Sequence, residues 1–172
     1  MITKITNSAG QTQQIARNFL ASQGEALQGN RSEQALVIAL FGELGSGKTT
    51  FAQGLAKGLG ITKRLISPTF IIVRTYSIQI KNKSIRQAQD KKSKIKDTNK
   101  NKKTFYHIDL YRIDSEEDLQ GLGIQDIIND PQNIVAIEWA ERLGKLLPKE
   151  RIDIHFRYID EKEREITIYK NE

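Results

Sequence analysis

Residues 35–50 read ALVIALFGELGSGKTT, and this stretch predicts the fold more directly than any other part of the chain. Residues 35–41 form a continuous apolar run, which is typical of a strand buried on both faces of a sheet. A glycine-rich turn follows at 42–47, and residues 48–59 carry apolar side chains at helical spacing. A strand, a tight turn and a helix in direct succession indicate an α/β architecture.

The glycine-rich turn matches the pattern G-x-x-x-x-G-K-[ST] of phosphate-binding loops. Glycines let backbone N–H groups face phosphate oxygens, and the start of the helix adds a positive dipole end. We expect Lys48 to neutralise the β- and γ-phosphates of a nucleotide and the Thr49 hydroxyl to ligate Mg²⁺. No N-K-x-D motif for reading guanine is present, so ATP is favoured over GTP. The expected nucleotide contacts are Gly42, Glu43, Leu44, Gly45, Ser46, Gly47, Lys48, Thr49 and Thr50.

Two acidic residues lie on or directly after predicted strands, at positions where they can bind a metal or orient water. Glu138 directly follows the apolar run 134–137, so it is expected at the C-terminal end of a buried strand, beside a bound metal. Asp109 shares a strand face with His107, and the two side chains can orient water. The plainer alternatives are an exposed acid at position 138 and a hydrogen bond between His107 and Asp109 within the core.

Two residues next to these motifs are further candidates. Thr69 lies in SPTF (67–70), where its hydroxyl can contact a γ-phosphate, although a plain turn is the alternative. Trp139, the only tryptophan, follows Glu138 and either packs beneath the phosphate loop or presents a face to a partner.

The remaining pattern predicts an α/β, three-layer fold of the P-loop NTPase type, with a mixed central sheet and a C-terminal antiparallel hairpin. The hairpin is predicted from the alternating segments 151–158 and 164–169. The other expected elements are strands at 2–6, 70–76, 105–110 and 134–137 and helices at 10–22 and 115–122.

Residues 77–104 interrupt this pattern with a polar, lysine-rich stretch. They hold ten basic and two acidic residues, a net charge of +8, whereas the whole chain carries +6. The rest of the chain is therefore mildly acidic, and the high isoelectric point reflects this segment. We interpret it as a disordered insertion in a single domain spanning 1–172. It lacks interleaved aromatic residues, so we expect salt-dependent phosphate affinity at most and no base-specific reading.

Composition excludes several classes of protein. The chain has no cysteine, which excludes disulfides, thiolate metal sites and cysteine nucleophiles, and its two histidines are too few for a histidine metal cage. No run approaches the roughly 20 apolar residues of a membrane span, and the first residues lack the pattern of a signal peptide. We expect a cytoplasmic protein without membrane contact.

Four motifs in order make the chain similar to a known family. They are GELGSGKTT (42–50), SPTF (67–70), HIDLYR (107–112) and AIEWAERL (136–143), with Leu147-Pro148 before the last hairpin. Over residues 2–76 and 105–170 the chain resembles the bacterial TsaE (YjeE) family. The resemblance implies an ATPase required for threonylcarbamoyladenosine in tRNAs that read ANN codons. It implies action with the TsaB–TsaD heterodimer, in which TsaD performs the transfer, and contact with tRNA only through that complex; no DNA is expected.

The resemblance also assigns roles to individual residues. It implies that Thr49 and Glu138 ligate Mg²⁺ and that Trp139 lies beside the nucleotide. It implies an N-terminal contact near the nucleotide around Ser8 and Thr12. The implied catalytic set is Lys48, Thr69 as a switch-like residue, Asp109 as an essential acid, and Glu138. The chain departs from the family at 77–104, where a short turn is usual.

Two other functions remain open at this point. A small-molecule kinase on the same scaffold needs an acceptor pocket and an arginine-bearing lid. The long insertion at 77–104 is rich in lysine and poor in arginine, so it does not match such a lid. An RNA-binding module regulated by nucleotide would use the basic segment for binding. For the ATPase we expect very slow hydrolysis without partners, because no arginine finger is evident in the chain.

Overall fold

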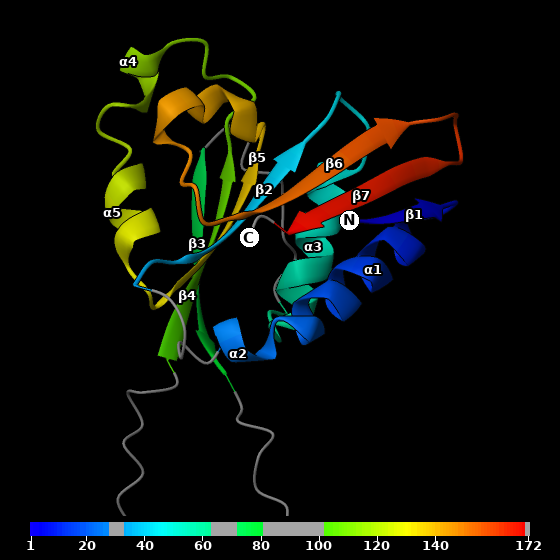
Figure 1. Ribbon diagram of the computed structural model, residues 1–172, viewed down its shortest axis with the longest axis horizontal. Coiled ribbons are helices and arrows are strands. Elements are labelled where there is room, and N and C mark those ends of the chain that lie inside the picture. The colour runs from blue at the N-terminus through cyan, green and yellow to red at the C-terminus, as the bar shows by residue number, and fades with distance from the viewer. Residues whose placement is uncertain (28–32, 63–71, 81–101, 171–172) are drawn as a thin grey trace, which may run out of the picture.

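The computed structural model of the protein describes residues 1–27, 33–62, 72–80 and 102–170 (Figure 1). Its strands are β1 (Ile2–Thr6), β2 (Leu36–Phe41), β3 (Val73–Gln79), β4 (Lys102–Asp109), β5 (Asn133–Glu138), β6 (Ile152–Tyr158) and β7 (Arg164–Lys170). Its helices are α1 (Ala9–Ser22), α2 (Gly24–Leu27), α3 (Lys48–Gly58), α4 (Glu116–Leu119), α5 (Ile124–Asn129) and the 3₁₀ segment η1 (Ala140–Leu146).

The described strands form one mixed sheet in the order β1-β7-β6-β2-β5-β4-β3. At its centre β2 runs parallel to both β5 and β6, and β4 runs parallel to β5. The outer pairs β3–β4, β6–β7 and β1–β7 are antiparallel. The predicted mixed sheet and C-terminal hairpin are therefore confirmed.

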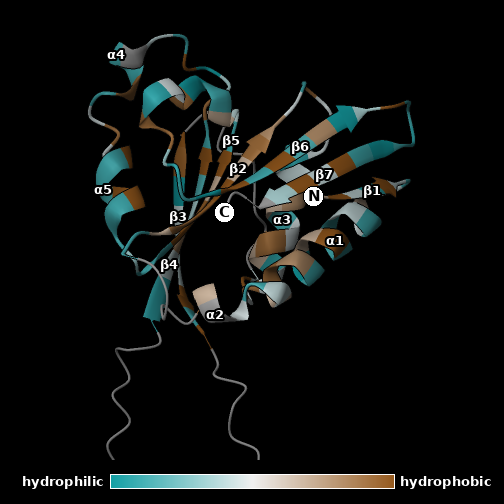
Figure 2. Cartoon of the chain, viewed as in Figure 1, coloured by the Kyte–Doolittle hydropathy of each residue, from teal (hydrophilic) through white to brown (hydrophobic). Residues whose placement is uncertain are grey.

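The sheet separates two hydrophobic cores, as its alternating side chains require. Ile38 and Leu40 of β2 pack in the cluster that includes residues of α1 and α3. Val37 and Ala39 of the same strand pack in the cluster that includes residues of α5 and η1. Figure 1 shows these helices on opposite sides of the sheet, and Figure 2 shows hydrophobic residues concentrated in the central strands. The expected three-layer α/β fold is confirmed.

The strand pair β3–β4 is longer than the sequence pattern suggested. Ser77 pairs with Thr104 and Gln79 with Lys102, so both ends of the lysine-rich stretch belong to strands. Ile78 between them is buried in the core, and its polar neighbours lie exposed, which is the alternation of a half-buried strand. Residues 81–101 and Thr69 lie outside the described residues.

Of the short helices, the sequence predicted one and missed the others. Ser115 and Asp118 form the capping box at the start of α4 where a helix was predicted. Neither α2, α5 nor η1 was predicted, because segments of four to seven residues do not show a helical period.

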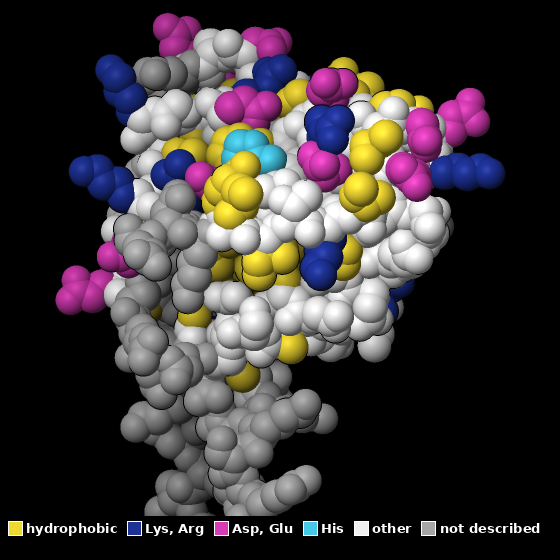
Figure 3. Space-filling view, turned by 45° about the vertical axis from the view of Figure 1, so that its right-hand side comes forward, with side chains coloured by type: hydrophobic (Ala, Val, Ile, Leu, Met, Phe, Trp, Pro, Cys, Tyr) yellow, Lys and Arg dark blue, Asp and Glu magenta, His cyan; other side chains and the backbone are white. Residues whose placement is uncertain are grey.

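The described surface mixes charges of both signs. On the face shown in Figure 3, acidic and basic side chains lie beside one another over its upper and right-hand parts. Along the described ranges of the chain, no helix combines the length and the apolar content that a membrane crossing requires.

The helix that follows the phosphate loop packs very closely against α1. A Cβ atom added at Gly54 of α3 would lie 2.6 Å from the Ala16 Cβ and 2.6 Å from the Gln13 carbonyl oxygen. A Cβ at Gly58, one turn later, would meet the movable Leu20 Cδ2 at 2.8 Å. The absence of a side chain at Gly54 therefore sets the distance between the two helices.

We expect Gly54→Ala to lower the free energy of unfolding by about 1–3 kcal/mol, because its methyl group meets backbone that cannot move aside. Gly58→Ala is the matched control, and we expect a smaller effect because only a side-chain end must shift while alanine favours the helix. Urea unfolding followed by circular dichroism measures both. A Gly54→Ala protein as stable as the control would contradict this account of the helix pair.

Candidate active site

The loop between β2 and α3 has a backbone that two of its glycines make possible. Gly42 has φ 138°, and a Cβ there would lie 2.4 Å from the Phe156 carbonyl oxygen of β6. Gly47, the residue before α3, has φ 110°. Residues with a Cβ atom are strained at such φ values. The glycines therefore allow the chain to turn sharply from the strand into the helix.

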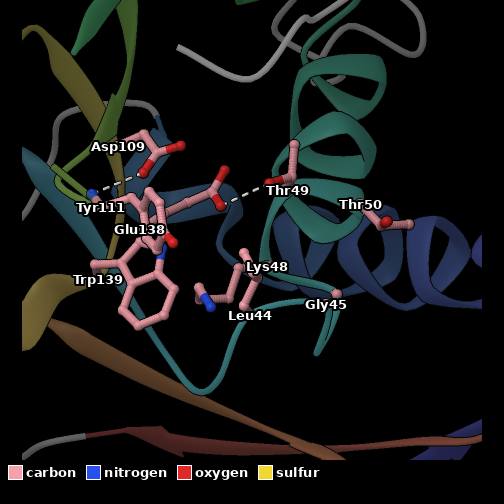
Figure 4. Close-up of a pocket in the computed structure, with 10 residues that line it drawn as sticks. Leu44, Gly45, Lys48, Thr49, Thr50, Asp109, Tyr111, Glu138 and Trp139 are labelled. Atoms are coloured by element: carbon pink, nitrogen blue, oxygen red, sulfur yellow. Dashed lines mark hydrogen bonds between the residues drawn. The ribbon is translucent and has the colours of Figure 1, made fainter. Parts of the chain in front are cut away.

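Lys48 is folded back into the curve of this loop. Its side chain is buried, and Nζ donates hydrogen bonds to the carbonyl oxygens of Gly42 at 2.5 Å and Glu43 at 2.8 Å. The same ammonium lies 3.9 Å from the centre of the Trp139 ring, a cation–π contact. The predicted phosphate-neutralising lysine and the predicted aromatic residue are thus in direct contact (Figure 4).

Glu138 joins the end of the sheet to the start of α3. Although it ends a strand, it is only 2 % exposed, so it is not a surface acid. The Thr49 hydroxyl donates to its Oε2 at 2.7 Å, and His107 Nε2 lies 2.6 Å from its Oε1. His107 therefore contacts Glu138, and the alternative of a plain His107–Asp109 pair is not what the structure shows.

Asp109 lies beside Glu138 on the neighbouring strand. The two residues are register partners of the parallel pair β4–β5, and Asp109 is 3 % exposed. Its Oδ1 accepts a hydrogen bond from the Tyr111 backbone N–H at 3.0 Å. The Tyr111 ring in turn lies 5.2 Å from that of Trp139, centre to centre.

Trp139 reaches Lys48 through an unusual backbone conformation. Its φ of 59° is in the left-handed region, which non-glycine residues rarely adopt. This turn directly follows Glu138 and leads into η1. Strain of this kind often accompanies functional sites, and here it places an aromatic ring against the loop lysine.

These side chains surround a cavity of about 320 Å³, the size of a small-ligand site. Figure 4 shows Asp109, Glu138 and Trp139 on one side of it and Thr49 of α3 on the other. The lining consists of Leu44, Gly45, Gly47, Lys48, Thr49, Thr50, Asp109, Tyr111, Glu138 and Trp139. Of these, only Tyr111 was not a predicted site residue, although its place in the same motif as Asp109 was a usable signal.

Other predicted residues lie away from the lining. Gly42 and Glu43 hold Lys48 from within the loop, and Ser46 is buried in it. Ser8 caps α1 by accepting from the Gln11 N–H, and Thr12 is hydrogen-bonded to the Thr6 hydroxyl at 2.9 Å. Neither Ser8 nor Thr12 borders the cavity, so the structure does not bring them to the other site residues.

Arg164 of β7 contacts the phosphate loop, and no sequence motif predicts this contact. Its Nε donates to the Gly45 carbonyl oxygen at 3.0 Å, which links the C-terminal hairpin to the phosphate loop. The two residues are far apart in the chain, and no motif contains them both.

The donor set fits a hard divalent cation. Thr49 and Glu138 bring two oxygen atoms within 2.7 Å of each other at the cavity wall. Among the described residues, no three His, Cys, Asp or Glu side chains are grouped to hold a metal by themselves. A cation here would take its other ligands from phosphate and water, which is how Mg²⁺ binds beside nucleotides.

Comparison with known proteins gives consistent matches along the chain. The profile of the family described as "Threonylcarbamoyl adenosine biosynthesis protein TsaE" matches residues 6–88 and 92–166. Proteins named "tRNA threonylcarbamoyladenosine biosynthesis protein TsaE" are similar to it. That of Bacillus subtilis is 35% identical over 76% of this chain and 67% of its own. That of Treponema pallidum is 33% identical over 81% and 86%, and that of Nostoc sp. is 32% identical over 90% and 86%.

A solved structure has the same fold. The crystal structure of Bacillus subtilis YdiB superposes with a TM-score of 0.62 at 27% sequence identity. The match covers 99% of this chain and 86% of that one.

We expect Lys48→Met to raise the free energy of unfolding at about pH 7. Burial lowers the pKa of the Lys48 ammonium, although nearby carboxylates, Glu138 first, oppose the shift. The unfolded chain therefore holds this proton to a higher pH than the folded protein does, which costs stability below the folded-state pKa. The cost decreases as the pH rises toward the ordinary value of 10.5.

Urea unfolding of the wild type and Lys48→Met at about pH 7 and about pH 10 measures the difference in their free energies of unfolding. We expect this difference to be smaller at the higher pH. A variant that is less stable than the wild type at about pH 7 would show that the loop carbonyls and Trp139 outweigh the cost of burial.

Proposed function

The chain belongs to the TsaE family of tRNA threonylcarbamoyladenosine biosynthesis proteins, and on that premise we propose that it is the Mg²⁺-dependent ATPase of this modification. ATP would bind on residues 42–50 and be hydrolysed in the cavity they share with Asp109 and Glu138. The observation that carries the proposal is the contact of Thr49, at the start of α3, with the buried Glu138 carboxylate.

Each group in the cavity has a role in this proposal. The loop N–H groups and Lys48 would bind the phosphates, because a loop at a helix start favours anions and lysine supplies a positive charge. Thr49 and Glu138 would hold Mg²⁺, which would supply positive charge that neutralises the phosphates. Asp109 and Glu138 are the two carboxylates available to orient the attacking water. Trp139 would lie beside the nucleotide, and Thr69 would respond to the γ-phosphate.

The composition of the cavity supports slow hydrolysis by the isolated protein. Among the described residues that line it, Lys48 is the only cation. Phosphoryl transfer is fast when a second positive group stabilises the transition state. We propose that the full rate requires the TsaB–TsaD heterodimer, and that the protein reaches tRNAs that read ANN codons through this complex, in the cytoplasm.

We expect Glu138→Gln to lower Mg·ATP hydrolysis by about 100-fold or more, both for the protein alone and with TsaB–TsaD, because the amide is a poor ligand for Mg²⁺ and a poor base. Glu150→Gln makes the same charge change at an exposed position outside the cavity and should leave the rate unchanged. Phosphate release measures the rates. Equal rates for wild type and Glu138→Gln would contradict the proposed role of Glu138.

The lysine-rich segment can be tested separately for RNA binding. Gln79 and Lys102 are register partners, so residues 81–101 can be replaced by Asn-Gly in a short hairpin turn. We expect this deletion to retain ATP hydrolysis, because the described residues that line the cavity belong to other segments. Filter binding with tRNA at low and moderate salt then measures what the segment adds. Loss of hydrolysis would show that the segment belongs to the ATPase machinery.

A further inference from the structure

His107 lies in the interior of the sheet next to the proposed cation site. Its side chain is 0 % exposed, and Nε2 lies 2.6 Å from Glu138 Oε1. We propose that His107 is a positioning residue that fixes the orientation of the Glu138 carboxylate, so that Oε2 is presented to Thr49 and to Mg²⁺. The inference rests on the proposed function and assigns a role within the same site.

The two carboxylate oxygen atoms of Glu138 have different partners. Oε2 accepts from Thr49 on α3, and Oε1 faces His107 on β4. The terminal torsion of a glutamate has broad, roughly two-fold freedom, so packing alone does not set which way the carboxylate plane faces. A carboxylate that acts as a cation ligand only accepts hydrogen bonds, so in that state His107 Nε2 would be the donor of this contact. A fixed donor on Oε1 therefore determines where Oε2 points.

His107 is itself held by the sheet. It is paired with Ala136 of β5 on one side and Arg74 of β3 on the other, so its backbone lies inside a three-strand ladder. Among the described residues, Nδ1 has no hydrogen-bond partner. Burying an imidazole nitrogen without a partner costs free energy that an apolar residue would avoid. The histidine is thus poorly explained by packing and well explained by its contact with Glu138.

His107 does not border the cavity, whereas Asp109, two residues along the strand, does. Its influence on a bound nucleotide must therefore pass through Glu138. This geometry predicts an effect on cation binding with little effect on nucleotide binding in the absence of a cation. Residues that orient a metal ligand typically change metal affinity by about 10–100-fold when mutated.

The test compares three variants of the full chain: His107→Gln, His107→Asn and His107→Leu. The glutamine amide nitrogen occupies the place of imidazole Nε2 and can donate to Glu138 Oε1, whereas the asparagine amide corresponds to Nδ1 and falls short. Leucine fills the space without a donor. Calorimetry with a non-hydrolysable ATP analogue, with and without Mg²⁺, measures binding independently of turnover, and Mg²⁺ titration of hydrolysis separates half-saturation from kcat.

We expect all folded variants to bind the analogue without Mg²⁺ to within about two-fold of wild type. The Mg²⁺ concentration for half-maximal effect should rise by about 10–100-fold in His107→Asn and His107→Leu and return close to wild type in His107→Gln. If His107→Leu fails to fold, the glutamine–asparagine pair, of nearly equal polarity and size, still decides the question.

Two results would overturn the proposal. Wild-type Mg²⁺ dependence in His107→Asn would show that Glu138 needs no positioning donor. Equal loss in the glutamine and asparagine variants would show a packing role only. If the wild-type protein itself binds the analogue equally with and without Mg²⁺, the proposed function fails, and the inference about His107 fails with it.

Discussion

The parallel pairing of β2 with β5 is the constraint on which the site depends. It sets Leu40 opposite Glu138, so the chain leaves β2 into the glycine loop at the sheet edge where β5 ends in an acid. The loop turns directly into α3, and Thr49 on its first turn meets that acid. Pairing of β4 with β5 then adds Asp109 at the same level. Parallel strands end together at one edge, and groups from distant parts of the chain are thereby brought together.

The site concentrates ionisable groups that would be unfavourable elsewhere in the interior. Lys48, Glu138 and His107 are all nearly inaccessible to water. Each charged group is held by designated partners: loop carbonyls and an aromatic face for the lysine, a hydroxyl and an imidazole for the glutamate. Buried charge is tolerated when it is paired and hydrogen-bonded. The apolar cores on the two faces of the sheet supply the rigidity that keeps these partners in place.

Local sequence patterns predicted the elements that carry the chemistry because their signals are short-range. The apolar run of β2, the glycine spacing before Lys48 and the acid after the β5 run were each readable within a few residues. The same patterns misplaced the ends of β3 and β4, since the residues on either side of the buried Ile78, Ser77 and Gln79, are polar and exposed. They also missed α5 and the wall residue Tyr111. Ser8 and Thr12, proposed by resemblance alone, serve the start of α1 away from the cavity.

The sequence by itself determined that this chain forms an α/β fold of the P-loop type, and it singled out Lys48, Thr49 and Glu138 as candidate site residues. Each of these signals is local. The spacing of glycines in a turn, the period of strands and helices, and an acid directly after an apolar strand can each be read from one short stretch of residues. Only the tertiary structure decided which atoms meet: Thr49 with Glu138 Oε2, His107 with Oε1, Lys48 with Trp139, and Arg164 with Gly45. The physical reason is that strand register and helix packing set these contacts, and both depend on side chains that are far apart in the chain.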